Sequence, residues 1–109
     1  MRFMEPEVVF GSWYECETDW GVEYANEQDV GFIGLELGEV MDADCPEWRR
    51  AKRALRPYLM GRPEEVTLIK GFGARTSAPG YLDCSDWVVF PSEAEALAYL
   101  AEELLGDAG

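Results

Sequence analysis

The chain has 109 residues, of which 48% are hydrophobic and 13% aromatic, so it can build the core of one domain and is not compositionally disordered. Its formal net charge is −13, so most of its surface should repel nucleic acid and anionic membranes and attract basic surfaces. Histidine is absent, which excludes catalysis by a histidine base and zinc sites of the Cys/His type.

Three widely spaced cysteines, Cys16, Cys45 and Cys84, argue against a disulfide framework and lack Cys-x-x-Cys spacing, so we interpret them as buried free thiols. The sequence contains no run of 18 apolar residues, so it predicts no membrane-spanning helix. The first residues lack the features of a secretory signal. We therefore expect a cytoplasmic protein, with no catalytic residue, bound metal or cofactor.

The N-terminal region, residues 1–45, predicts an acidic β region. Apolar residues alternate along 7–16 and again along 20–25, which is typical of two strands. Residues 30–37 are apolar but contain two glycines that disfavour a helix, and we predict a third strand there. Residues 39–44 are interpreted as an acidic loop.

Residues 46–60 predict a basic helix. Pro46 suits the first helical position, with Asp44 or Cys45 ahead of it as the cap. Pro57 should end or kink the helix near Arg56. The helix carries an apolar stripe at helical spacing, formed by Trp48, Ala51, Leu55 and Leu59.

Residues 66–106 predict a strand, a turn, a strand and a helix. The first strand begins at Val66, and two glycines at 71 and 73 suggest a bulge or a close approach of backbone. Residues 78–81 contain Pro-Gly and predict a type II turn into a strand over 81–90. The helix that follows should be capped by Ser92 with Glu95 and should end at Gly106. Its apolar stripe is predicted at Leu97, Leu100, Ala101 and Leu104.

The resulting order is βββαββα. It predicts a single α+β domain over 1–109, with a mainly antiparallel sheet of four or five strands and two helices packed on it. Its parts are the acidic β region 1–45, the basic helix 46–60 and the C-terminal unit 66–106.

Charge is distributed unevenly. Residues 1–47 hold 13 acidic groups and one basic group, whereas 48–62 hold six basic groups and no acidic one. Carboxylates spaced along a strand can imitate a phosphate track, so we predict a partner-binding acidic face; the alternative is a solvated face that only aids solubility. The predicted partner-binding residues are Glu15, Glu17, Asp19, Glu23, Glu27, Asp29, Glu36, Glu39, Asp42 and Asp44.

The basic helix has two interpretations. Its clustered cations could contact phosphate, but we favour neutralisation by acidic neighbours, partly through surface ion pairs. Asp83 and Asp86 could form a paired-carboxylate or metal site, but they point apart on a regular strand. Of four tryptophans, most should lie in the core and one or two could anchor an interface.

Residues 75–87, with Val89-Phe90 and the helix start at 92–96, resemble a module of small acidic proteins of bacteriophages and related mobile elements. Those proteins carry the string SAPGY(L/M)DCT(D/E)W before a "VF…EEA…YL" helix, and Ser85 stands here where threonine is usual. The resemblance covers about residues 66–105 and assigns no functional residue. It implies a phage-type origin and, by analogy, an inhibitor of host defence such as an anti-CRISPR or antirestriction protein.

We therefore expect a non-enzymatic phage-type protein whose acidic, nucleic-acid-mimicking face binds and inhibits a host nucleic-acid-binding defence complex. Its partner would be a basic surface of a host protein or ribonucleoprotein, without direct nucleic-acid binding or membrane contact, and it would act as a monomer or homodimer. The alternative is a small phage accessory or structural module that binds itself or a partner through an aromatic sheet face. A small hydrolase would need a metal or cofactor that the sequence does not indicate.

Overall fold

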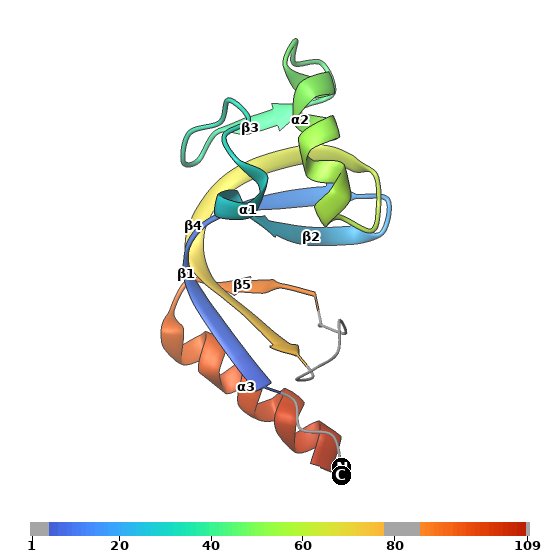
Figure 1. The fold of residues 1–109 in the computed structure, drawn as a ribbon. Coiled ribbons are helices and arrows are strands. Elements are labelled where there is room, and N and C mark those ends of the chain that lie inside the picture. The colour runs from blue at the N-terminus through green and yellow to red at the C-terminus, as the bar shows by residue number, and fades with distance from the viewer. Residues whose placement is uncertain (1–4, 78–85, 109) are drawn as a thin grey trace. The chain divides into compact units, whose positions relative to one another are not determined.

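The computed structural model describes residues 5–77 and 86–108, and these residues form the α+β fold that the sequence predicts. Five strands make an antiparallel sheet in the order β2-β1-β4-β3, with β5 also paired to β4 (Figure 1). The strands are β1 Glu5–Thr18, β2 Gly21–Asn26, β3 Val40–Asp42, β4 Pro63–Ser77 and β5 Val88–Phe90. The helices are α1 Glu27–Val30, α2 Trp48–Leu55, the 3-10 helix η1 Arg56–Tyr58, and α3 Glu93–Ala108.

The chain divides into two compact units, one of residues 11–70 and one of residues 1–10 with 71–109. The long strands β1 and β4 contribute residues to both units. All ten predicted partner-binding residues and the whole basic segment belong to the 11–70 unit.

The core of the 11–70 unit forms between the β1–β2 hairpin, α2 and the chain around β3. Antiparallel pairing places Tyr14 opposite Ala25, and both side chains are buried in this core. From α2 come Trp48, Ala51 and Leu55, which confirms the predicted stripe; Leu59 packs half-buried against the same core. The core-facing residues of the hairpin, which recur every two positions, thus pack against those of α2, which recur about every 3.6 positions.

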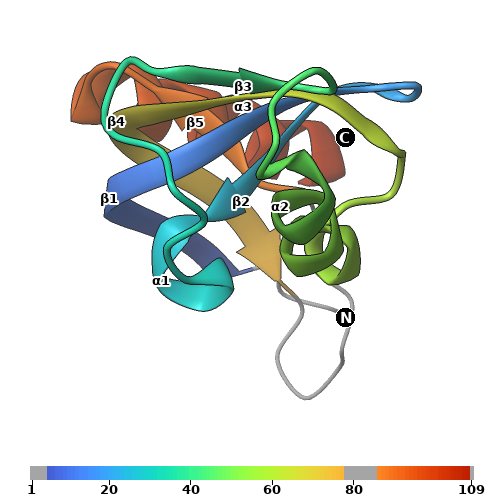
Figure 2. The same ribbon diagram turned by 90° about the horizontal axis from the view of Figure 1, so that it is seen from above.

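The predicted third strand over 30–37 is wrong. The chain forms the short helix α1, continues without regular structure and returns as β3, inside the segment predicted to be a loop (Figures 1 and 2). Gly31 and Gly34 have φ of 93° and 99°, a left-handed region that an extended strand cannot use. Ile33 and Leu35 are nevertheless buried, so alternating apolar residues here reflect core packing and not a ladder.

The start of the basic helix also differs from the prediction, whereas its end agrees. Helix α2 begins at Trp48 with Glu47 as N-cap, and no side chain caps it, so neither Asp44 nor Cys45 has that role. The α-helix stops at Leu55 and tightens into η1, which contains Pro57. Proline cannot donate the next helical hydrogen bond, which accounts for the change at Arg56.

In the other unit, α3 packs on β4 and β5 through Ala96 and Leu100, together with Phe90 and Tyr99. Leu97 and Ala101 are exposed, so the predicted stripe was wrong at these two positions. Leu100 is buried as predicted, and Ala96, four residues before it, lies on the same helical face. The side chain of Leu104 lies outside the described residues.

The predicted helix cap is confirmed. Ser92 Oγ accepts a hydrogen bond from the Glu95 N–H at 3.3 Å and donates to the Glu95 carboxylate at 3.0 Å. The predicted end at Gly106 is wrong, because α3 continues to Ala108. Gly71 confirms the predicted close approach: a Cβ there would lie 2.7 Å from the Phe90 carbonyl oxygen. The predicted turn at 78–81 and the first half of the strand over 81–90 lie outside the described residues.

Candidate functional site

The ten predicted partner-binding residues occupy three parts of the 11–70 unit. Four lie in the β1–β2 hairpin, two in α1, and four between α1 and α2 around β3. Within the hairpin, Glu15 and Glu17 share a face, whereas Glu23 pairs with Cys16 and therefore lies on the core face. The hairpin thus presents two carboxylates together, and Glu23 is not beside them.

Glu23 is held by the segment that follows η1. Its carboxylate accepts hydrogen bonds from the N–H groups of Met60 and Gly61 at 2.7 and 2.8 Å, and from the Thr18 hydroxyl at 2.8 Å. Burial acts to raise the pKa of Glu23, but these three donors outweigh it and the pKa lies below its usual value. The carboxylate therefore stays ionised and fixes the segment to the hairpin.

Four more of the ten carboxylates bind their own chain. Asp19 Oδ1 accepts from the Arg62 N–H at 2.6 Å, and Glu15 accepts from the Tyr24 hydroxyl at 3.2 Å. Around β3, the carboxylates of Glu39 and Asp42 accept from nearby backbone N–H groups at 2.9 and 3.0 Å. These contacts give the four side chains a structural role in turns and in the hairpin.

The other five carboxylates make no hydrogen bond or ion pair with any residue in the described part of the chain. Glu27 is half-buried and the other four are exposed. The five are Glu17, Glu27, Asp29, Glu36 and Asp44. These five are the members of the predicted set whose charge is left for a partner or for solvent.

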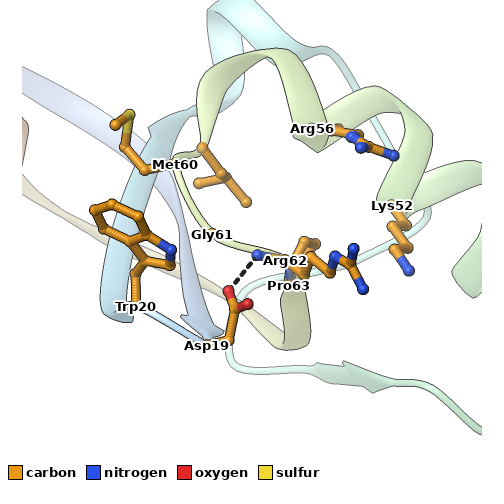
Figure 3. Close-up of a pocket in the computed structure, with 9 residues that line it drawn as sticks. Asp19, Trp20, Lys52, Arg56, Met60, Gly61, Arg62 and Pro63 are labelled. Atoms are coloured by element: carbon orange, nitrogen blue, oxygen red, sulfur yellow. Dashed lines mark hydrogen bonds between the residues drawn. The ribbon is translucent and has the colours of Figure 1, made fainter.

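The structure also forms a cavity that the sequence did not predict. It has a volume of about 530 Å³ and is lined by Asp19, Trp20, Lys52, Arg56, Leu59, Met60, Gly61, Arg62 and Pro63. Figure 3 shows the cationic groups of Lys52, Arg56 and Arg62 on one side, with Trp20 and Met60 at the other end. Trp20 is 71% exposed and lies in the hairpin turn, not in the strand predicted over 20–25.

Two carboxylates hold the backbone of residues 60–62, which we call the floor of the cavity. Glu23 and Asp19 bind the three successive N–H groups of residues 60–62, which places the side chains of Met60 and Arg62 at the cavity. Glycine is required at 61, since a Cβ would lie 2.5 Å from Asp19 Oδ1 and 2.6 Å from Thr18 Oγ1. The cavity therefore depends on contacts between segments about 40 residues apart in sequence.

The ion pairs expected around the basic helix are not formed by the cations at the cavity. Within residues 5–77 and 86–108, no carboxylate forms a salt bridge with Lys52, Arg56 or Arg62. An ion pair at 2.9 Å joins Arg75 to Glu7 in the other unit. The prediction for the basic helix was neutralisation by acidic neighbours, partly through surface ion pairs. Its ion-pair part is wrong at Lys52 and Arg56, and neutralisation without direct contact stays a prediction. A signal was present in the sequence, because Lys52 and Arg56 are four residues apart and share a helical face.

Two of the cysteines are free thiols: Cys16 is buried as predicted, whereas Cys45 is only half-buried. Burial, with the nearby carboxylates of Glu23 and Glu15, raises the pKa of Cys16 to about 12. Cys45 Sγ donates a hydrogen bond to the Glu47 carboxylate at 2.8 Å, and this bond raises the pKa of Cys45. A thiolate is the reactive form, so neither cysteine is an activated nucleophile.

The described residues contain no group of three or more acidic or cysteine side chains placed to hold a metal ion. Of the proposed carboxylate pair, Asp86 is exposed and Asp83 lies outside the described residues, as does Cys84. Over the described part of the chain, none of the helices has the length and hydrophobicity needed to span a membrane.

Comparisons with protein-family models, with curated proteins and with solved structures found no match for this chain.

Proposed function

We propose that this protein is a non-enzymatic binding protein that docks its unpaired carboxylates on a basic surface of another macromolecule. The observation that carries the proposal is the set of five carboxylates, Glu17, Glu27, Asp29, Glu36 and Asp44, that form no ion pair or hydrogen bond with the described chain. A carboxylate with no partner in its own chain can steer association and pair with a lysine or arginine of another molecule.

Within that class, we propose an inhibitor of phage or mobile-element type. Its target would be a nucleic-acid-binding defence complex of a bacterial host, as in anti-CRISPR or antirestriction proteins, and it would act in the host cytoplasm. Two considerations support this: carboxylates can occupy a groove built for phosphates, and residues 66–105 resemble a phage module.

The test compares two charge-matched variants in a pull-down against bacterial nucleic-acid-binding defence complexes. The first removes three unbonded carboxylates, by Glu17→Gln, Glu36→Gln and Asp44→Asn. The control removes three exposed carboxylates of α3, by Glu93→Gln, Glu102→Gln and Glu103→Gln. We expect the first variant to bind about tenfold more weakly or worse, and the control to change little. The loss of binding by the first variant should be larger at low salt. Equal binding by the two variants would contradict the proposal.

A second candidate is self-association through apolar side chains. The 11–70 unit exposes several large ones, of which Trp20, Val22 and Phe32 are 71%, 56% and 76% exposed. Exposed aromatic residues are enriched at interface hot spots. Light scattering coupled to size exclusion separates the candidates: a homodimer insensitive to salt favours self-association, and a monomer at all salt concentrations argues against it.

A further inference from the structure

We propose that the cavity beside α2 is a binding site for an organic phosphate that carries a planar ring, the chemistry of a nucleotide. This site is separate in residues and opposite in charge from the unbonded carboxylates. It rests on three features of the cavity: its cations, which form no salt bridge with a described carboxylate, its exposed indole, and the backbone of residues 60–62 held by Glu23 and Asp19.

The cations define where the phosphate binds. Lys52 and Arg56 come from successive turns of α2 and η1, and Arg62 comes from the segment before β4 (Figure 3). None of the three is in a salt bridge with a described carboxylate, so their donors are available to a ligand. Two guanidinium groups and one ammonium can each donate charge-assisted hydrogen bonds to phosphate oxygens, which suits phosphate better than a single carboxylate.

Trp20 defines where the ring binds. Its side chain is 71% exposed at the tip of the β1–β2 hairpin, at the end of the cavity away from the cations (Figure 3). Stacking of a base on an aromatic side chain contributes about 1–3 kcal/mol and does not require a particular base. The apolar side chains of Leu59, Met60 and Pro63 also line the cavity, and Asp19 and Gly61 complete the lining.

Size and charge limit the ligand. A volume of about 530 Å³ falls within the range of small-molecule sites. A long nucleic-acid strand would extend beyond the cavity over a chain of net charge −13. A free nucleotide therefore fits better than a strand, although a strand end bearing a phosphate would offer the same chemistry.

The floor of the cavity is already formed without ligand. Glu23 and Asp19 fix the N–H groups of residues 60–62, so the Arg62 side chain starts from a backbone that need not be ordered on binding. Preorganisation of this kind lowers the entropic cost of binding.

The test is isothermal titration of the full chain at low ionic strength with AMP, inorganic phosphate, adenosine, a 5′-phosphorylated oligonucleotide and poly-glutamate. We expect AMP to bind, phosphate to bind more weakly, and adenosine not to bind. AMP binding tighter than the oligonucleotide assigns the site to free nucleotides, and the reverse order assigns it to strand ends; either order supports the site. No binding of AMP, or binding of poly-glutamate at least as tight as that of AMP, overturns the proposal.

Variants separate the two halves of the site. Arg56→Gln and Arg62→Gln should each weaken AMP and phosphate by about tenfold, because each removes a charge-assisted contact. Trp20→Ala should weaken AMP by about tenfold while phosphate binding stays the same. The matched control is Arg53→Gln, which removes an exposed charge of the same helix that does not line the cavity. If Arg53→Gln weakens AMP as much as Arg56→Gln does, the effect is general electrostatics and the site is refuted.

Discussion

Two charged regions of the 11–70 unit are held in different ways. At the cationic cavity, the carboxylates of Glu23 and Asp19 accept backbone N–H groups from residues far away in sequence. Around β3, the predicted partner-binding carboxylates either accept a neighbouring N–H, as Glu39 does, or bind nothing in the described chain, as Asp44 does. The difference shows that a count of charges does not identify a binding face, because part of the acidic surplus is used to hold the fold.

The largest effect should come from Glu23→Ala. It leaves the N–H groups of Met60 and Gly61 without their acceptor, and we expect a loss of about 2–3 kcal/mol in the free energy of unfolding. Urea denaturation measures it. Glu17→Ala is the control for loss of charge and should change stability by less than about 0.5 kcal/mol. Similar losses in the two variants would remove the distinction between bonded and unbonded carboxylates.

The next effect should come from Gly61→Ala. The new Cβ would lie 2.5 Å from Asp19 Oδ1 and 2.9 Å from Thr18 Cβ, so the hairpin must shift, at a cost of about 1–3 kcal/mol. Gly11→Ala is the matched control, because nothing lies within 4 Å of its Cβ position. Thermal unfolding of the pair should show a lower midpoint for Gly61→Ala alone. An unchanged midpoint would mean that the segment over 60–62 is not packed on the hairpin.

Acid should weaken the hydrogen bonds between the Glu23 carboxylate and the N–H groups of Met60 and Gly61. Because the pKa of Glu23 is lower in the folded chain than in the unfolded chain, the unfolded state binds the proton first as pH falls. The stabilisation is complete above the ordinary glutamate pKa of about 4.3 and is lost as pH falls through the lower folded value. The stability difference between wild type and Glu23→Gln should therefore shrink toward acid pH. A difference independent of pH would contradict an ionised Glu23.

The smallest effect, of opposite sign, should come from Asp42→Asn. Asp42 lies directly opposite Glu65 in the β3–β4 pair, and like charges in that position repel. Asparagine removes the repulsion and keeps an oxygen for the Asp44 N–H, so we expect a gain of about 0.3 kcal/mol. Urea denaturation at low salt should show the gain and high salt should reduce it, whereas a loss of stability would contradict the repulsion.

Local patterns predicted the elements whose signals lie within a few residues. The alternation along β1 and β2, the stripe of Trp48, Ala51 and Leu55, and the cap at Ser92 all follow from periods and turn chemistry. The segment over 30–37 was mistaken for a strand because its buried side chains alternate while its glycines take left-handed conformations.

The cavity could not be predicted in the same way. Its floor depends on hydrogen bonds between residues 37 to 43 positions apart, and no local pattern in the sequence encodes such pairs. The basic stripe of α2 was visible, but whether acidic neighbours would neutralise it depended on where the chain placed them. Tertiary contacts also decide which carboxylates stay available to a partner. The sequence could not predict them, because bonded and unbonded carboxylates look alike in it.

Backbone amide hydrogen exchange at Met60, Gly61 and Arg62 tests most directly whether carboxylates hold the cavity floor. Met60 and Arg62 are exposed, so protection of their N–H groups depends on Glu23 and Asp19. We predict that all three amides are protected in the wild type, and that Glu23→Ala releases Met60 and Gly61 while Glu17→Ala releases none. Exchange of these amides in the wild type as fast as in an unstructured peptide would contradict the account.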